Sequence, residues 1–451
     1  MRITVIGGGL AGSEAAWQSA ECGADVTLFE MRPRVQTPAH RTGHLAELVC
    51  SNSLKSRLPT AASGLLKAEL CLLGSVLLEE AEASAVPAGS ALAVDRAKFA
   101  EAVTTRLEGH PRITIVREEV SALPPSGDAT IVASGPLTSP NLSDALRDVV
   151  GGGYLFFYDA ISPIVMADSV DRSVLFPAAR YEKGDPDYLN APFTREQYYA
   201  FVDALMRAER FEPHPFERGK FFAACTPIED LAVRGSDTLA HGCMRPVGLV
   251  DPRTGERPFA VVQLRSETVH ATMYSLVGFQ TRLKQGEQRR VFRMIPGLGR
   301  AEFTRYGSLH RNTFICAPRV LAASLEHRQR PGLFFAGQLT GVEGYVESIA
   351  TGWLAGRNAA RRAAGQGVVV PPEVTALGSL TSWLSGSPAE GYQPMNVNFG
   401  LLPPLATRKG GRRERYQLMS ERALGAMRRW GADHGFSSHV DEGVVGLEGR
   451  C

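Results

Sequence analysis

The sequence has little of what marks several common protein classes. No apolar run approaches the roughly 20 residues that a membrane-spanning helix needs, so no membrane partner is expected. The seven cysteines include no CxxC pair and no spacing typical of metal ligands, and an odd number does not suit a disulfide scaffold. These absences argue against a metal-binding module and a disulfide-rich secreted domain. They favour a protein of the reducing cytoplasm with no metal site.

An excess of charge of one sign is also missing. The 49 Lys and Arg residues nearly balance 47 Asp and Glu residues, for a formal net charge of +2, which is too small to imply nucleic-acid binding by itself. The hydrophobic fraction of 44% and the charged fraction of 21% are typical of globular proteins. A chain of 451 residues is too long for one ordinary hydrophobic core, so we expect two or three domains.

A glycine-rich motif near the N-terminus is the most informative feature that is present. The apolar run 3–6 leads into Gly7-Gly8-Gly9-Leu10-Ala11-Gly12, and a helix-forming stretch follows. Residues 24–30 then read as a second strand that ends in Glu30. An acid about 20 residues after the glycines is the spacing of a dinucleotide-binding βαβ unit. The alternative is a glycine-rich turn with a purely structural role.

Each part of this motif has a physical role in binding a dinucleotide. Gly7 permits the tight turn, Gly9 lets the backbone approach a pyrophosphate, and Gly12 allows the helix to pack closely on the strand. The helix N-terminus supplies unpaired N–H groups and a positive dipole for the phosphates. The carboxylate of Glu30 is expected to accept hydrogen bonds from ribose hydroxyls.

Two further segments favour FAD over NAD as the dinucleotide. Residues 331–336 read as a strand that runs into Gly337 and Gln338, and a glycine-rich loop with Gly344 and Tyr345 then opens a helix of small residues. A third apolar strand, 129–133, ends in a turn at Gly135. One cofactor spanning three distant segments is typical of flavoproteins with two dinucleotide folds. The alternative is an ordinary Rossmann core with unrelated glycine turns.

These segments define the expected architecture. We predict an α/β, Rossmann-like two-dinucleotide-fold flavoprotein with an inserted α+β domain. Residues 1–150 and 315–451 would form a discontinuous FAD-binding domain, and residues 151–314 the insertion. A linker near 365–385, rich in Pro, Ser and Gly, would lead to a basic C-terminal subregion. Within the insertion, Thr194 and Gln197 resemble the capping box of a helix.

Two cysteines and two basic stretches are candidates for chemistry and binding. Cys50 and Cys225 have polar or turn-forming neighbours that would suit an exposed thiolate, although a lone cysteine is more often a small buried hydrophobe. The basic stretches could follow a phosphate backbone or could be solvated helix faces. Their leading members are Arg408, Lys409, Arg412, Arg413 and Arg415 in one stretch, and Arg282 and Lys284 in the other.

The chain resembles the folate- and FAD-dependent tRNA (uracil-5-)-methyltransferases along nearly its whole length. The motifs that carry this resemblance are family-specific and occur in order. They include GGGLAGSEAAWQ, ELVCSNSLKS, CTPIEDLA, LVGFQTRLK, RYGSLHRNTFI, FFAGQLTGVEGYVES and QPMNVNFGLLPPL.

The resemblance implies methylation of the T-loop uridine of tRNA at C5. The carbon would come from 5,10-methylenetetrahydrofolate and the electrons from FADH2, which NAD(P)H would regenerate. Two cysteines serve the site in similar enzymes, and they match Cys50 and Cys225. We assign Cys225 as the nucleophile that attacks uracil C6, with Cys50 assisting proton or methylene transfer. His310 would stack on the pterin ring, and the basic stretches would contact the T-arm.

Two other functions remain open at this point. A related family of FAD- and folate-dependent enzymes modifies the wobble uridine of tRNA, but it carries a long helical C-terminal region for which this chain has no room. The other alternative is a flavin oxidoreductase acting on a small metabolite, for which the cysteine motifs have no explanation.

Overall fold

The N-terminal segment forms the βαβ unit that its sequence predicts. Strand β1 (Arg2–Ile6) leads into helix α1 (Leu10–Glu21), and strand β2 (Asp25–Phe29) returns parallel to β1. The computed structural model describes residues 1–49, 53–124, 128–151, 154–160, 162–182, 185–211, 220–221, 226–266, 271–307, 309–390, 392, 394–406 and 411–436.

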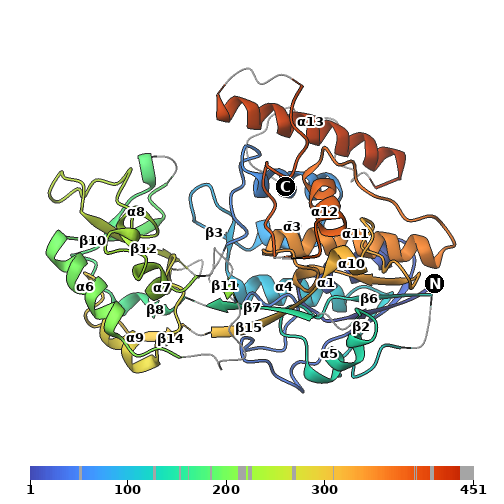
Figure 1. Ribbon diagram of the computed structural model, residues 1–451, viewed down its shortest axis with the longest axis horizontal. Coiled ribbons are helices and arrows are strands. Elements are labelled where there is room, and N and C mark those ends of the chain that lie inside the picture. Colours follow the sequence, from blue (N-terminus) through green and yellow to red (C-terminus); the bar gives the residue numbers. More distant parts are fainter. Residues whose placement is uncertain are drawn as a thin grey trace.

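Around this unit a five-stranded parallel sheet gathers distant parts of the chain (Figure 1). Its order is β16-β6-β1-β2-β5, and the added strands are β5 (Ile113–Val116), β6 (Ala129–Val132) and β16 (Leu333–Phe335). Every pairing in the sheet is parallel. The carboxyl ends of β1, β6 and β16 therefore lie at one edge, which is where open α/β sheets bind ligands.

Helix α11 (Tyr345–Ala363) packs on α1 with almost no space between the two backbones. A Cβ atom on Gly352 would lie 2.2 Å from the carbonyl oxygen of Ala11, and one on Gly356 would lie 2.5 Å from that of Ala15. The glycines are four residues apart and so share one helix face. This close crossing brings the N-termini of both helices to the same edge of the sheet.

Helix α1 also buries an acid. Glu14 is fully buried and accepts hydrogen bonds from Gln18, from the Ser75 hydroxyl at 2.9 Å and from the Leu77 N–H at 3.0 Å. The last two donors lie at the start of α3 (Val76–Ala83), so Glu14 caps that helix from outside. Burial raises the pKa of Glu14 to about 7.

This burial predicts a pH dependence of stability. The folded protein keeps a proton on Glu14 where the unfolded chain, with a pKa near 4.5, has lost it. The stabilisation is therefore complete below about pH 4.5 and is lost as the pH rises through about 7. We expect Glu14→Gln to remove a decline of about 3 kcal/mol in the free energy of unfolding across that window. Urea unfolding at several pH values measures it, with the exposed Glu101→Gln as the control that keeps the decline.

The remaining helices of the first lobe surround the parallel sheet and α11. A short hairpin of β3 (Ala85–Val86) and β4 (Ala93–Val94) follows α3 in the chain. The helices are α2 (Ala62–Leu72), α3, α4 (Arg96–Glu108), α5 (Pro140–Arg147), α10 (Ala317–Val320), α12 (Ala376–Gly386) and α13 (Arg412–Asp433).

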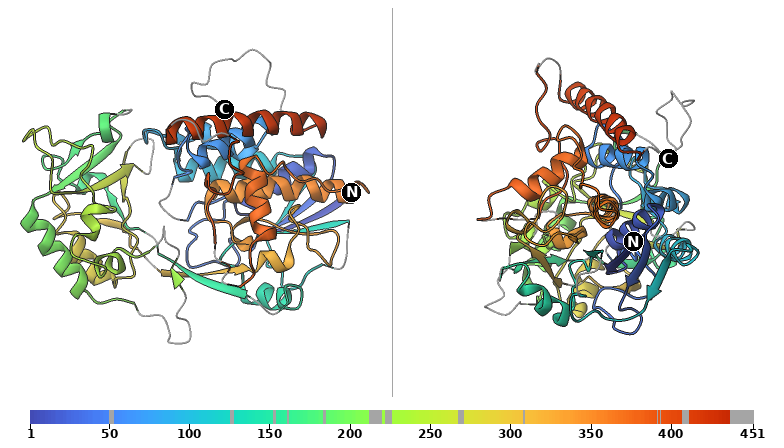
Figure 2. Two further views of the ribbon diagram at one scale, coloured as in Figure 1. Left: turned by 45° about the horizontal axis from the view of Figure 1, so that its top comes forward. Right: turned by 90° about the vertical axis from the view of Figure 1, so that its right-hand side faces the viewer.

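A second lobe is built around a six-stranded antiparallel sheet of order β14-β8-β13-β12-β10-β9. Its own hydrophobic core is separate from that of the first lobe and contains Phe201, Leu264 and Phe292. Figure 2 shows this lobe, coloured green to yellow, standing to one side of the rest of the chain. Its strands are β8 (Ile164–Met166), β9 (Phe176–Pro177), β10 (Tyr188–Phe193), β12 (Ala260–Ser266), β13 (Met273–Leu276) and β14 (Phe303–Arg305).

The α-helices of this lobe, in its described residues, pack around the sheet. They are α6 (Arg195–Arg207), α7 (Ile228–Ala232), α8 (Thr238–His241) and α9 (Gln285–Phe292). The predicted capping box at the start of α6 is confirmed, because Thr194 and Gln197 exchange hydrogen bonds between side chain and backbone.

Two long strands join the lobes. Strand β7 (Tyr154–Ala160) pairs antiparallel with β15 (Leu309–Ile315) along its whole length, and β11 (Lys220–Phe221) adds to β7. A second connection comes from the β3–β4 hairpin, where the Gly89 N–H donates to the carboxylate of Asp187. The second lobe thus meets the first at a backbone ladder and at a side-chain contact.

The structure differs from the expected linker over 365–385. Residues 376–386 form α12, whose Leu377 and Leu380 are fully buried, and Thr375 caps it. Glu69, also fully buried, accepts from the first two N–H groups of this helix at 2.7 and 2.9 Å. The prediction of a linker was wrong for these residues because the helix is buried on most sides. The sequence of α12 therefore lacks the alternation of apolar and polar faces by which a surface helix is recognised. Its many small residues are instead typical of a segment rich in turns.

Cysteine bonding is mixed in the described residues. Cys71 is disulfide-bonded, whereas Cys22, Cys243 and Cys316 are free. Within the same part of the chain, no helix is both long and apolar enough to cross a membrane.

Candidate cofactor site

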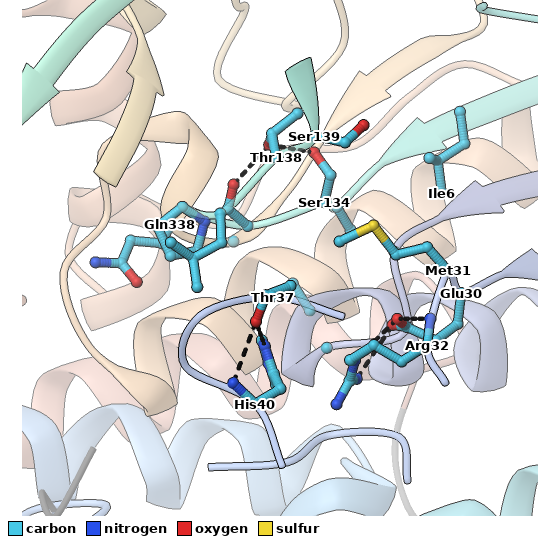
Figure 3. Close-up of a pocket in the computed structure, with 18 of the residues that line it drawn as sticks. Ile6, Glu30, Met31, Arg32, Thr37, His40, Ser134, Thr138, Ser139 and Gln338 are labelled. Atoms are coloured by element: carbon cyan, nitrogen blue, oxygen red, sulfur yellow. Dashed lines mark hydrogen bonds and ion pairs between the residues drawn. The ribbon is translucent and has the colours of Figure 1, made fainter. Parts of the chain in front are cut away.

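A cleft opens at the carboxyl edge of the parallel sheet, where the sequence predicts a dinucleotide (Figure 3). Its walls come from the β1–α1 turn, the end of β2 and the loop after it, the turn after β6, and the start of α11. Most of the predicted cofactor residues line it, namely Gly7, Gly9, Leu10, Ala11, Glu30, Gly135, Gly337, Gln338 and Tyr345.

The other three predicted glycine positions lie behind this wall. The N–H of Gly8 donates to the carboxylate of Glu30 at 2.9 Å. Gly12 packs against the turn, since a Cβ atom there would lie 1.8 Å from the carbonyl oxygen of Gly7. Gly344 is the residue that precedes α11 and has a φ of +128°, which favours glycine.

The β1–α1 turn fits the phosphates of a dinucleotide. Gly7 has a φ of +104°, and a Cβ atom on Gly9 would meet no atom of the described residues within 4 Å, so the backbone is open on that side. Among the described residues no side chain caps α1, which leaves the first N–H groups of the helix available to a ligand. The residues present therefore suit a bound pyrophosphate.

Glu30 is part of a buried ion-pair network that the sequence did not predict. Arg32, 2% exposed, donates from Nε to Glu30 Oε1 at 2.9 Å and from Nη2 to Glu30 Oε2 at 3.2 Å. Its Nη1 also donates to Glu47 Oε2 at 3.1 Å. Burial alone would raise the pKa of Glu30, but the hydrogen bonds and charge of Arg32 outweigh it and hold the pKa below its usual value. Glu30 is thus fixed as a carboxylate at the cleft wall.

The loop after β2 places His40 in the cleft (Figure 3). Its Nδ1 lies 2.6 Å from the Thr37 hydroxyl, and the backbone N–H of His40 donates to the same oxygen. Burial, together with the charge of Arg32, lowers the pKa of His40 to about 4. The imidazole is therefore neutral near pH 7 and can offer a hydrogen bond to a ligand without adding charge.

The N-terminus of α11 carries a second ion pair. Glu347, in the first turn of the helix, has a fully buried side chain that accepts from Lys55 Nζ at 3.0 Å. Lys55 Nζ also donates to Asn396 Oδ1. Tyr345 and Ser348, on either side of Glu347 in this turn, line the cleft.

Several predicted site residues, including both catalytic cysteines, lie outside the described part of the chain. Cys50 and Cys225 lie outside it, as do Arg408 and Lys409. The backbone of His310 lies in β15, paired with Asp159 of β7. Their roles therefore stay predictions.

The remaining basic candidates have different surroundings. Arg282 is engaged inside the second lobe, because its side chain is 12% exposed and pairs with Asp230 at 2.7 Å. Lys284 pairs with Glu209 at 2.7 Å on the surface. Arg412 and Arg413 are exposed at the start of α13, and Arg415 is half-buried in the next turn. The start of α13 is thus the more accessible of the two basic stretches.

Sequence reasoning missed the loop residues Arg32, Thr37, His40 and Glu47, all of which line the cleft. One signal was present, because Arg32 follows the strand-ending acid by two positions in a Glu-x-Arg sequence. The others follow from the path of an irregular loop, which no periodic pattern reveals.

Comparison with known proteins gives a consistent family assignment. A family model described as glucose inhibited division protein A matches residues 2–367. The chain is 54% identical to methylenetetrahydrofolate–tRNA-(uracil-5-)-methyltransferase TrmFO of Moorella thermoacetica over 94% of this chain and 97% of that one. It is 56% identical to the protein of the same name from Symbiobacterium thermophilum, over 96% and 97%.

Among solved structures, Aquifex aeolicus GidA superposes with a TM-score of 0.72 at 18% sequence identity, covering 97% of this chain and 74% of that chain. This likeness supports the predicted Rossmann-like flavoprotein fold. The sequence matches extend over nearly the whole of both chains and are far closer. The chain therefore belongs to the glucose inhibited division protein A family and, within it, to the methylenetetrahydrofolate–tRNA-(uracil-5-)-methyltransferases.

Proposed function

We propose that this protein methylates C5 of the T-loop uridine in tRNA, with 5,10-methylenetetrahydrofolate as carbon donor and FADH2 as reductant. The observation that carries the proposal is the identity of 54–56%, over nearly the full length of both chains, to relatives named as methylenetetrahydrofolate–tRNA-(uracil-5-)-methyltransferases. The cleft supports it, because its glycine turn and uncapped helix suit a dinucleotide. A cytoplasmic location, where tRNA is found, goes with this activity.

The residues of the cleft divide the work of holding FAD. The N–H groups at the start of α1 would bind the pyrophosphate, and Glu30, held by Arg32, would accept from the adenosine ribose. The loop with Gly337 and Gln338 and the start of α11 would hold the ribityl and isoalloxazine end. When bound there, FAD would supply the electrons that reduce the transferred carbon to a methyl group, and NAD(P)H would restore them.

The two predicted cysteines would supply the nucleophilic chemistry. Uracil C5 is a poor nucleophile, but addition of a thiolate to C6 turns the ring into an enolate that is nucleophilic at C5. We assign this addition to Cys225. Cys50 would assist proton or methylene transfer, and the thiolate leaves C6 after the C5 proton is removed.

Substrate binding would use the basic start of α13 and a base taken out of its stack. Arg412 and Arg413 are exposed there and carry the charge that a phosphate backbone attracts. A folded T-loop buries its uridine, so the base has to be extruded to reach a catalytic pocket. His310 stays the candidate for stacking on the pterin ring.

The test is methylation of an unmodified tRNA transcript with methylenetetrahydrofolate and NAD(P)H, read by nucleoside mass spectrometry. Ribothymidine that depends on folate, and not on S-adenosylmethionine, supports the proposal. A modified wobble uridine instead would favour the related tRNA-modifying activity. No tRNA product from flavin-replete enzyme would favour an oxidoreductase of small molecules.

A further inference from the structure

Glu347 is a buried carboxylate at the N-terminus of α11 that the proposed chemistry leaves without a role. Its side chain is 0% exposed, and its Oε1 accepts from Lys55 Nζ at 3.0 Å and from the Val397 N–H at 3.2 Å. Its Oε2 is buried and has no hydrogen-bond partner among the described residues. This oxygen lies beside Gly344, since a Cβ atom there would lie 2.3 Å from it. A half-satisfied buried carboxylate is costly, so its retention calls for an explanation.

Lys55 is held in place for this pairing. Its backbone has a φ of +63°, an uncommon conformation for a residue other than glycine. Backbone hydrogen bonds with Leu92 fix the segment on both sides, at 2.8 Å each, and Lys67 Nζ donates to the Leu54 carbonyl at 2.6 Å. Uncommon backbone conformations persist only where the surroundings enforce them, and they concentrate at functional sites.

Three charges meet at the N-terminus of α11, from the helix dipole, Glu347 and Lys55. The N-terminus of a helix carries about half a positive charge, which a buried carboxylate beside it would more than cancel. The ammonium of Lys55 compensates Glu347 and leaves the helix end positive where Tyr345 and Ser348 line the cleft. Lys67 lies nearby, but burial lowers its pKa to about 7, so it contributes only part of a charge.

We propose that Lys55, paired with Glu347, sets the reduction potential of the flavin held at the start of α11. The inference rests on the FAD binding proposed above. Two electrons and one proton, delivered as a hydride by NAD(P)H, convert bound FAD into an anionic hydroquinone. A positive site beside it stabilises that anion and so favours reduction. Lys55 acts on the flavin through its charge.

The experiment measures the midpoint potential of the bound flavin by equilibration with a reference dye in the FAD-loaded protein. We expect Lys55→Met to shift the reduction equilibrium at least tenfold toward the oxidised form, which is about 30 mV for two electrons. Glu347→Gln removes the opposite charge and should shift it the other way. The double variant should lie near the wild type.

Arg57→Met is the matched control. Arg57 lies in the same segment, is 34% exposed beside 37% for Lys55, and pairs with Glu82 at 2.8 Å away from α11. It should leave the potential unchanged, as should Lys55→Arg, which keeps the charge. If Lys55→Met and Glu347→Gln shift the potential in the same direction, the proposal is overturned. General damage to the site would shift the potential one way whichever charge is removed, whereas loss of opposite charges shifts it in opposite directions.

Two further outcomes separate this inference from the proposed function. If Lys55→Met does not fold or hold FAD, Glu347→Gln still tests the sign, and an unchanged or lowered potential there refutes the inference. A wild-type protein that binds FAD but does not methylate tRNA would contradict the proposed function. The midpoint potentials of the variants would still show whether Lys55 sets the potential of the flavin. Wild-type protein that binds no FAD refutes both.

Discussion

Replacing Cys225 with alanine is expected to lower tRNA methylation by at least about a thousandfold while the protein stays yellow with bound FAD. Without a thiolate at C6, uracil C5 is too poor a nucleophile to attack the methylene carbon. The flavin should remain because the cleft is built from other segments, which meet at the edge of the parallel sheet. Single-turnover assays with saturating tRNA and folate would measure the loss.

The matched control is Cys243→Ala. Burial raises the pKa of the Cys243 thiol to about 11, so it is not a thiolate at neutral pH and its removal should leave the rate within a few-fold. Full activity of Cys225→Ala would contradict the assignment.

Cys50→Ala should also abolish turnover without loss of flavin. If Cys225 is the nucleophile, a covalent protein–RNA adduct should form with the Cys50→Ala variant and not with the Cys225→Ala variant. An adduct with Cys225→Ala alone would mean that Cys50 is the nucleophile.

Replacing Arg32 with methionine is expected to destabilise the protein by about 3–5 kcal/mol and to weaken FAD binding. Arg32 is the shared partner of two carboxylates, at 2.9 Å from Glu30 and 3.1 Å from Glu47, and it is almost fully buried. Removing one partner of a buried network leaves uncompensated charge, which costs several times more than the loss of a surface pair. Urea unfolding without cofactor measures the stability, and fluorescence titration with FAD measures the affinity.

Arg34→Met provides the comparison, because Arg34 lies two residues away in the same loop. Its side chain is 66% exposed, and its ion pair with Glu118 is long, at 3.4 Å. Exposed pairs of this kind contribute little, so the variant should stay within about 0.5 kcal/mol of the wild type. If Arg32→Met and Arg34→Met lower the free energy of unfolding equally, the loop tolerates no change at either position. The buried ion pairs of Arg32 would then not explain the loss.

The parts of the fold that could be predicted are those that depend on short, local sequence patterns. The first βαβ unit, the strand before Gly135 and the helix after Gly344 each depend on short patterns of glycine, apolar and helix-forming residues. These patterns place most of the cleft wall. The capping box at Thr194 is equally local, since both of its hydrogen bonds span three residues.

The parts that were not predictable depend on contacts across the chain. Arg32 needs Glu47, which reaches it only because an irregular loop turns back over the sheet edge. Lys55 needs Glu347, and the first turn of α12 needs Glu69, from elements far away in sequence. Burial on most sides also hides the period by which α12 would be recognised. Such pairings are decided by packing, not by propensity.

The glycine-mediated crossing of α1 and α11 has a consequence for the order in which the molecule is made. Ser19 donates to the Gly356 carbonyl across 337 positions, so the crossing joins the beginning of the chain to a segment synthesised much later. A ribosome releases the turn at Gly9 long before the helix that completes the cleft. Until then the nascent chain carries only part of the cleft wall. We therefore expect FAD to bind only after α11 has been made, and a chain truncated before α11 should bind no flavin.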